Sequence, residues 1–124
     1  MPSFLEATFA RLNAAPSELL VMSLHDASGR YIASYEYPGT RGTVALKYRP
    51  LVARALSHRA HRLLLLHNHP SGDPTPSVAD IAATANLTAL FLPLELALHD
   101  HLIVGGGSVV SMRRAGLFPT PEVL

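Results

Sequence analysis

The segment from residue 62 to residue 80 constrains the fold more than any other part of the sequence. It begins with the apolar run RLLLL and continues as HNHPSGDPTPSVAD. A short apolar run of this kind is typical of a central strand buried on both faces. The loop that follows contains three prolines and a glycine, which make it stiff, and Ser77 has the preferred chemistry of a helix N-cap. The segment therefore predicts a strand, a shaped loop and a helix whose apolar face includes Val78, Ile81, Ala82 and Ala85.

The rest of the chain alternates between helical and strand patterns. Residues 3–12 carry apolar side chains at helical spacing, with Ser3 as the expected N-cap. Residues 18–24 and 31–37 are expected to pair as a hairpin across the turn sequence HDASGR. Pro50 suits the first turn of another helix. Further strands are expected at residues 43–46, 94–98, 102–104 and 109–112, with residues 105–107 (GGG) as a tight connection.

This order of elements predicts the α/β or α+β class, with a mixed β-sheet flanked by helices in one domain spanning residues 1–124. An apolar content of 48% with 15% charged residues indicates a globular chain. The absence of cysteine excludes a cysteine-based metal site and suits a reducing compartment. The N-terminus lacks a signal-peptide pattern, and Pro93 and Glu95 interrupt the longest apolar region. We therefore expect a cytoplasmic protein without a membrane segment.

Two histidines and an aspartate in the 62–80 segment form a candidate metal site. His67 and His69 are two residues apart at a strand end, so their side chains face the same way. Asp80 lies in the first turn of the following helix, where its carboxylate points back toward the loop. Three such protein ligands leave the fourth zinc position open for water, as in catalytic zinc sites. The sequence therefore predicts a catalytic Zn²⁺ held by these three residues.

Each residue of this set also has a purely structural explanation. A histidine at a strand end is usually a partly exposed polar residue. Asp80 follows Ser77 at capping-box spacing, where an acidic side chain would stabilise the helix without any metal. The combination of HxHP, a stiff loop and SxxD favours the metal site over these separate explanations.

A hydrolase that activates water also needs a general base, usually a carboxylate that does not bind the metal. The candidates are Glu6, Glu18, Glu36, Glu95 and Glu122. Glu18 opens the first expected strand, and Glu36 lies near the end of the second. Spacing alone leaves the choice between them open.

The same residues carry a family resemblance. The pattern His67-x-His69-Pro70 followed by Ser77-x-x-Asp80 resembles the JAMM (JAB/MPN) zinc metalloprotease motif, and the longer string HNHPSGDPTPSVAD resembles its RadC-like branch. The similarity extends to residues 42–44 (GTV), 60–66 and 100–105 (DHLIVG), and it covers roughly residues 18–118. The pattern departs from that branch at its N-terminus, where RadC-like proteins usually carry a DNA-binding helix-hairpin-helix region.

The resemblance implies a fold and a set of roles. The implied fold is a mixed, curved β-sheet flanked by helices, of the MPN/JAMM-like (cytidine-deaminase-like) type. Zinc would be bound by His67, His69, Asp80 and a water. The general base would stand at the start of an early strand after the first helix, which corresponds to Glu18 and not to Glu36. Ser77 would stabilise an oxyanion in addition to capping the helix.

Three functions follow as expectations. The first is a zinc metallopeptidase or isopeptidase that acts on a peptide or protein substrate. The second is a nucleic-acid-associated module or nuclease, suggested by a basic stretch that also reads as a solvated helix face; its residues are Arg41, Lys47, Arg49, Arg54, Arg59 and Arg62. The third is a binding module that holds zinc without catalysis. Outside the ligand set, we expect a structural role for His99 and an orienting contact to a ligand for His101, whereas Asn68 should face away from the metal.

Overall fold

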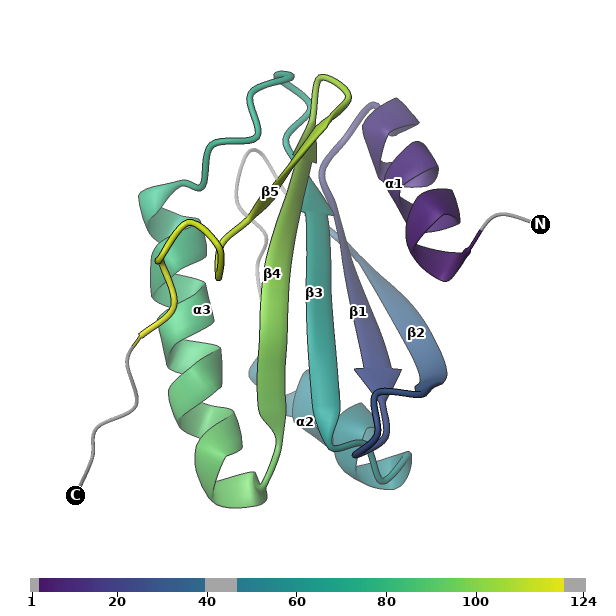
Figure 1. Cartoon of the computed structure of the whole chain (residues 1–124), viewed down its shortest axis with the longest axis vertical. Helices are drawn as coiled ribbons and strands as arrows, with labels where there is room; N and C mark the ends of the chain where they lie inside the picture. The colour runs from purple at the N-terminus through teal and green to yellow at the C-terminus, as the bar shows by residue number, and fades with distance from the viewer. Residues whose placement is uncertain (1–2, 40–46, 120–124) are drawn as a thin grey trace.

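The computed structural model describes residues 3–39 and 47–119 (Figure 1). In chain order the elements are α1 (Phe4–Ala14), β1 (Leu19–His25), β2 (Tyr31–Pro38), α2 (Tyr48–Ser57), β3 (Arg62–Asn68), α3 (Val78–Phe91), a 3₁₀ turn (Leu92–Leu94), β4 (Ala97–Gly105) and β5 (Ser108–Ser111). The expected strand at residues 43–46 and the GTV sequence at 42–44 lie outside the described residues.

The strands form one five-stranded sheet in the order β2-β1-β3-β4-β5. Strand β1 pairs antiparallel with both β2 and β3, β3 pairs parallel with β4, and β4 pairs antiparallel with β5. Because α3 connects the two parallel strands, it crosses over the sheet between them. The expected mixed sheet flanked by helices is confirmed, and it is consistent with a JAB/MPN-like fold.

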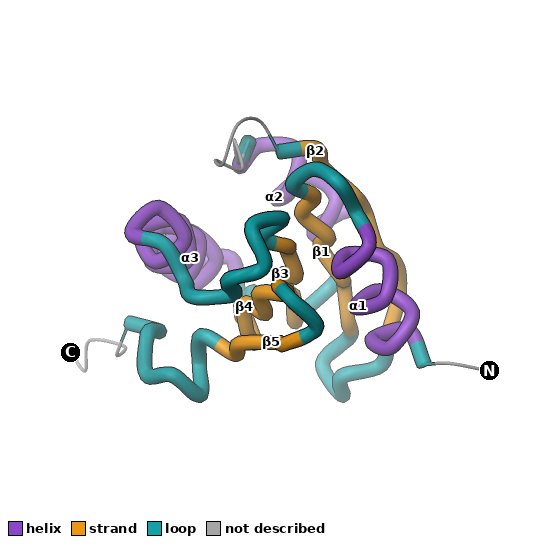
Figure 2. Tube along the Cα trace, turned by 90° about the horizontal axis from the view of Figure 1, so that it is seen from above, coloured by secondary structure: helices purple, strands orange, loops and turns teal. Residues whose placement is uncertain are grey.

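Helices cover both faces of the sheet. Figures 1 and 2 show α2 and α3 on one side and α1 on the other. The larger core lies under α2 and α3, where Leu51 and Phe91 pack with Met22 and Leu65 of the central strands. A smaller core joins Leu12 of α1 to the opposite face. Within the described part of the chain, every helix is too short or too polar to cross a membrane.

Local signals place the helix starts correctly. Ser3 caps α1 by accepting a hydrogen bond from the Glu6 amide at 3.1 Å. Ser77 and Asp80 form a full capping box at the start of α3. The turn between β1 and β2 is closed by Asp26, whose carboxylate accepts hydrogen bonds from the amides of Ser28 and Arg30. These bonds depend only on neighbouring residues, so a sequence pattern can predict them.

Two expectations about the second half of the chain were wrong. The buried residues of α3 are Thr84, Leu87 and Phe91, whereas Val78 is 85% exposed. This helix is apolar around most of its surface, so apolarity does not mark the face that packs. The strands expected at 94–98 and 102–104 are one strand, β4, and Leu94 belongs to the 3₁₀ turn instead.

An irregularity in β4 explains why its two histidines differ. Leu63 pairs with Leu98 but Leu64 pairs with Asp100, so β4 carries one extra residue at this point. A bulge of this kind interrupts the alternation of side chains. His99 is consequently exposed, while His101 is buried beneath α3 at 2% exposure.

Candidate metal centre

The register of the sheet brings the candidate residues together at one end of the central strands, the upper end in Figure 1. Leu20 near the start of β1 pairs with His67 near the end of β3. Glu18, two residues before Leu20, therefore lies beside the histidine strand. The loop after β3 returns the chain over this edge, so that the first turn of α3 carries Asp80 to the same place.

The three predicted zinc ligands present their atoms to one another at short range. The Nε2 atoms of His67 and His69 are 3.0 Å apart. Asp80 places Oδ1 at 3.3 Å from Nε2 of His67 and Oδ2 at 3.1 Å from Nε2 of His69. Zinc bonds of about 2.0–2.1 Å in a tetrahedral site put ligand atoms about 3.3 Å apart. The donor set therefore has dimensions that fit a zinc ion.

Glu18 also lies close to His67. Its Oε1 is 3.8 Å from Nε2 of His67. Among the described residues, the ligand atoms of Glu18, His67 and His69 all lie within 4.8 Å of one another, so Glu18 is itself a possible third ligand. The shorter distances of Asp80 favour Asp80 in that place, with Glu18 just outside it.

The Glu18 carboxylate is buried and incompletely partnered. The residue is 8% exposed, and its Oε2 has no hydrogen-bond partner among the residues that the structure describes. A buried carboxylate oxygen without a partner is costly, because it has lost its hydration. Glu18 therefore has a free acceptor directed into the site, as a group that binds or deprotonates a water requires.

Glu36 does not share this position. Its carboxylate accepts a hydrogen bond from Arg11 at 2.6 Å on the molecular surface. Glu6 and Glu95 are exposed, and Glu122 lies outside the described residues. Of the glutamates that the structure describes, Glu18 is the one placed beside the histidines.

The backbone around Glu18 is fixed by Asn68. The Asn68 side chain faces away from the two histidines, as expected from strand alternation. Its Oδ1 accepts from the Leu19 amide at 2.7 Å, and its Nδ2 donates to the Ser17 carbonyl at 3.1 Å. The peptide groups on both sides of Glu18 are therefore bound by the residue that separates the two histidines. Strand alternation predicts the direction of the Asn68 side chain, but it does not predict these hydrogen bonds to the backbone around Glu18.

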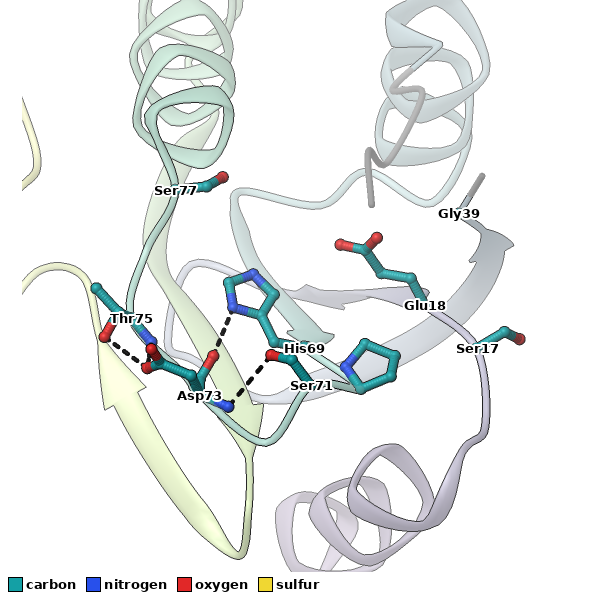
Figure 3. Close-up of a pocket in the computed structure, with 9 residues that line it drawn as sticks. Ser17, Glu18, Gly39, His69, Ser71, Asp73, Thr75 and Ser77 are labelled. Atoms are coloured by element: carbon teal, nitrogen blue, oxygen red, sulfur yellow. Dashed lines mark hydrogen bonds between the residues drawn. The ribbon is translucent and has the colours of Figure 1, made fainter. Parts of the chain in front are cut away.

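The opening beside these residues is a pocket of about 590 Å³. Figure 3 shows the Ser77 hydroxyl and the Glu18 carboxylate pointing toward each other across the space beside the His69 ring. Ser77 Oγ accepts a hydrogen bond from the Asp80 amide at 3.1 Å, which leaves its own proton free to donate. Capping the helix and donating to a ligand in the pocket are thus compatible.

The loop holds His69 in a defined protonation pattern. Its Nδ1 lies 2.9 Å from the carbonyl oxygen of Asp73, and a carbonyl can only accept. The Nδ1 atom therefore carries the proton, and Nε2 presents a lone pair to the site. The β4–β5 turn supports the loop from behind: a Cβ at Gly106 would lie only 2.6 Å from the Gly72 carbonyl oxygen.

Electrostatics favour a charged Asp80 and a neutral His101. Burial alone would raise the pKa of the Asp80 carboxyl, but the neighbouring His67 ring and the hydrogen bond from the Ser77 amide hold that pKa well below its ordinary value. Burial, reinforced by neighbouring His67, lowers the pKa of His101 to about 3, so this ring is neutral at pH 7. The carboxylate form of Asp80 is the form that binds metal.

Comparison with known proteins identifies the family of this chain. The family described as "RadC-like JAB domain" matches residues 2–117. A UPF0758 protein of Rhodobacter capsulatus is 45% identical over 103 residues, which cover 82% of this chain and 48% of that protein. A UPF0758 protein of Stenotrophomonas maltophilia is 38% identical over 113 residues, 90% of this chain and 48% of that protein.

A further relative is the UPF0758 protein of Ruegeria pomeroyi, which is 47% identical over 78 residues, 63% of this chain and 35% of that protein. The chain thus spans about half or less of the length of these relatives. Because the family match covers nearly the whole sequence, from the first helix to the residues after β5, this chain belongs to the RadC-like JAB domain family.

Proposed function

We propose that this chain is a zinc-dependent hydrolase, acting as a metallopeptidase or isopeptidase. The observation that carries the proposal is the convergence of His67, His69 and Asp80 within 3.3 Å, with the partly unpartnered carboxylate of Glu18 beside them. Two imidazole nitrogens held 3.0 Å apart, one of them with its lone pair fixed inward, are best satisfied by a cation between them.

The donor set fits zinc better than the harder divalent cations. Two imidazoles and one carboxylate are typical of zinc, whereas magnesium and calcium prefer oxygen ligands. His67, His69 and Asp80 would hold the ion. When bound in such an open site, zinc lowers the pKa of a coordinated water to about 7 and polarises a substrate carbonyl.

The remaining roles belong to the side chains around the pocket. Glu18 would accept the proton of the attacking water on its carboxylate and pass it to the leaving amine. Ser77 would donate its free hydroxyl proton to the oxygen that becomes negative as the carbonyl is attacked. Asn68 and the backbone it binds keep the carboxylate of Glu18 at this position.

An open pocket suits a polypeptide better than a small enclosed ligand. The lining residues are Ser17 and Glu18 just before β1, Gly39 just after β2, and residues of the 69–77 loop, so a polypeptide can lie between segments that are separate in the sequence. We therefore propose a peptide or protein substrate, including one with an isopeptide bond. The cysteine-free sequence suits a reducing cytoplasm as the place of this activity.

Zinc content and turnover of matched variants test the proposal. The wild-type protein should purify with one zinc per chain and cleave unstructured or isopeptide-linked peptides. Glu18→Gln should keep the zinc and lose at least about 100-fold in turnover, because the base is removed. Glu36→Gln changes the same residue type on the surface and should keep both properties.

Two results would change the assignment. Wild-type protein that holds no zinc after gentle purification contradicts the metal site. Protein that holds zinc but cleaves neither kind of peptide, with Glu18→Gln indistinguishable from it, indicates a zinc-holding binding module instead.

A nucleic-acid-associated module or nuclease has weaker support. It rests on the basic stretch between residues 41 and 62, and one of these basic side chains, Arg54, is engaged in contacts within the protein. Arg54 lies 4.0 Å above the Tyr35 ring and donates to the Tyr37 hydroxyl at 2.8 Å. Binding to DNA that weakens steeply as salt rises would revive this function.

A further inference from the structure

A chain of three hydrogen bonds joins α3, β4 and β3 beneath the proposed metal ligands. The Thr84 hydroxyl lies 2.8 Å from the carbonyl oxygen of Asp80 and 2.8 Å from Nδ1 of His101. Nε2 of His101 lies 2.7 Å from Nδ1 of His67. Thr84 and His101 are buried at 0% and 2% exposure, so these bonds form away from water. Figure 1 shows α3 lying alongside β4, which makes this contact possible.

The direction of donation along these hydrogen bonds follows from the bond between Thr84 and the Asp80 carbonyl. The Asp80 carbonyl can only accept, so the single Thr84 hydroxyl proton points to it, as in other helical threonines that bond one turn back. Thr84 Oγ1 must then accept from His101, which places the His101 proton on Nδ1. His101 is buried at 2% exposure between the Thr84 hydroxyl and the His67 ring, and such burial without a carboxylate partner favours a ring with a single proton. With that proton on Nδ1, the ring has a lone pair on Nε2, and His67 must donate to it from Nδ1.

We propose that Thr84 and His101 are positioning residues that fix His67 as the Nδ1-protonated tautomer. With Nδ1 committed to His101, Nε2 of His67 presents its lone pair to the site. The chain begins on the backbone of one proposed ligand, Asp80, and ends on the ring of another, so it also ties their relative positions. The inference deepens the proposed function, because it explains how the site is prepared for a metal.

His67 and His69 differ in the group that accepts a hydrogen bond from their Nδ1 atoms. His69 donates to a backbone carbonyl of its own loop. His67 instead depends on a second imidazole, which can reverse its donor and acceptor atoms. A threonine anchor removes that freedom, and without it either tautomer of His67 can form a hydrogen bond to His101.

Nitrogen-15 NMR of the histidine rings in metal-free protein tests the tautomer directly. Wild-type His67 and His101 should both carry the proton on Nδ1, with Nε2 unprotonated. In Thr84→Val, which keeps the side-chain shape, His67 should become a mixture of tautomers. Zinc affinity, measured by competition with a chromophoric chelator, should weaken by about 10-fold to 100-fold.

Two control variants separate positioning from general packing. Thr84→Ser keeps the hydroxyl and should restore a single tautomer and near wild-type zinc affinity. Thr88→Val removes the same kind of bond one turn later, where the Thr88 hydroxyl donates to the Thr84 carbonyl at 2.8 Å, and it should leave both readouts unchanged.

The inference would be overturned if His67 of the wild-type protein carried its proton on Nε2. It would also be overturned if the Thr84→Val variant folded and bound zinc as tightly as wild type. If Thr84→Val does not fold, the wild-type tautomer and the Thr84→Ser variant still decide the question. A single Nδ1-protonated tautomer in a protein that binds no zinc would support the positioning role while contradicting the proposed function, so the two failures are distinguishable.

Discussion

Asp80 has two tasks that can be separated at the scale of one residue. Its Oδ2 accepts a hydrogen bond from the Ser77 amide at 2.8 Å, which completes the capping box, and the same carboxylate faces both histidines. A cap needs only an acceptor oxygen, whereas a zinc ligand in this set needs the negative charge.

Asp80→Asn should therefore keep most of the stability and lose much of the metal. The third position of a capping box accepts an amide as well as a carboxylate, and loss of the charge near the helix start costs about 0.3–1 kcal/mol. The free energy of unfolding in urea should therefore change by about 1 kcal/mol or less without zinc. Zinc affinity should fall at least tenfold, as measured by chelator competition. If Asp80→Asn lost stability but bound zinc as tightly as wild type, Asp80 would act in the helix cap alone.

The choice of Glu18 over Glu36 shows where residue-level sequence reasoning ends. Both are glutamates near strand ends, and the distance along the chain does not say which reaches the histidines. The pairing of Leu20 with His67 decides it, because it sets β1 against β3 with Glu18 at the site. The family resemblance pointed to Glu18, but the residue spacing could not.

At the scale of elements, the turn between β4 and β5 supports the loop that carries His69. Gly106 and Gly107 both have positive φ, at 57° and 79°. A Cβ on Gly106 would meet the Gly72 carbonyl oxygen, whereas a Cβ on Gly107 would meet nothing within 4 Å. The Gly72 amide in turn donates to the His69 carbonyl at 3.0 Å.

These two glycines form a matched pair for mutagenesis. Gly107→Ala adds only left-handed backbone strain and should cost about 1–2 kcal/mol of unfolding free energy while keeping zinc affinity. Gly106→Ala adds the same strain and displaces the 69–77 loop, so it should cost more and weaken zinc binding at least tenfold. Urea denaturation and chelator competition measure the two effects. Equal zinc affinities in both variants would show that the turn does not position the loop.

The β1–β2 hairpin supplies a pH-dependent element away from the site. A hydrogen bond from the Ser28 hydroxyl, with others from the backbone amides of Arg30 and Ser28, lowers the pKa of Asp26. The folded pKa is thus below the unfolded value of about 3.9. The stabilisation is therefore present above about pH 4 and is lost as the pH falls through the folded pKa.

Comparison of wild type with Asp26→Asn checks this sign. The difference between their urea midpoints should stay constant from pH 7 to pH 5 and shrink below pH 4, as the wild-type carboxyl becomes protonated. Metal-free protein avoids titration of zinc binding during the experiment. A difference that grows on acidification would contradict the assignment.

Local signals made most of these elements predictable. Ser3, Ser77 and the turn at residues 25–30 act through neighbouring residues, so their patterns locate helix starts and a hairpin. The bulge in β4 and the buried face of α3 depend on partners far away in the sequence. An apolar helix can pack on several faces, and contact of Asp80 and Thr84 with β3 and β4 selects the observed one.

At the scale of the whole molecule, the site joins three segments that are separate in the sequence. Residues 17–19, 67–69 and 77–80 contribute to it, and they belong to β1, β3 and α3 or their immediate flanks. The proposed zinc ligands come from two of these segments, 67–69 and 77–80, and an ion that binds both only in the folded state stabilises the fold.

Zinc should therefore raise the thermal stability of the protein as a unit. Free zinc at about 100 times its dissociation constant should add about 2.7 kcal/mol to the free energy of unfolding. Differential scanning calorimetry should show one transition that moves upward with zinc and returns with chelator. His69→Ala should remove the response, and magnesium should not replace zinc. A zinc-independent midpoint in the wild type would contradict the site.

The alternation of side chains at the end of β3 also limits how such a chain can change. His67 and His69 face the site from one side of the strand, while Asn68 between them binds the backbone of Glu18 on the other. Insertion or deletion of one residue within β3 would exchange these faces, placing an amide among the metal ligands and a histidine against β1. Changes in length can therefore be accommodated in the loops around the site, but not within the strand that carries it.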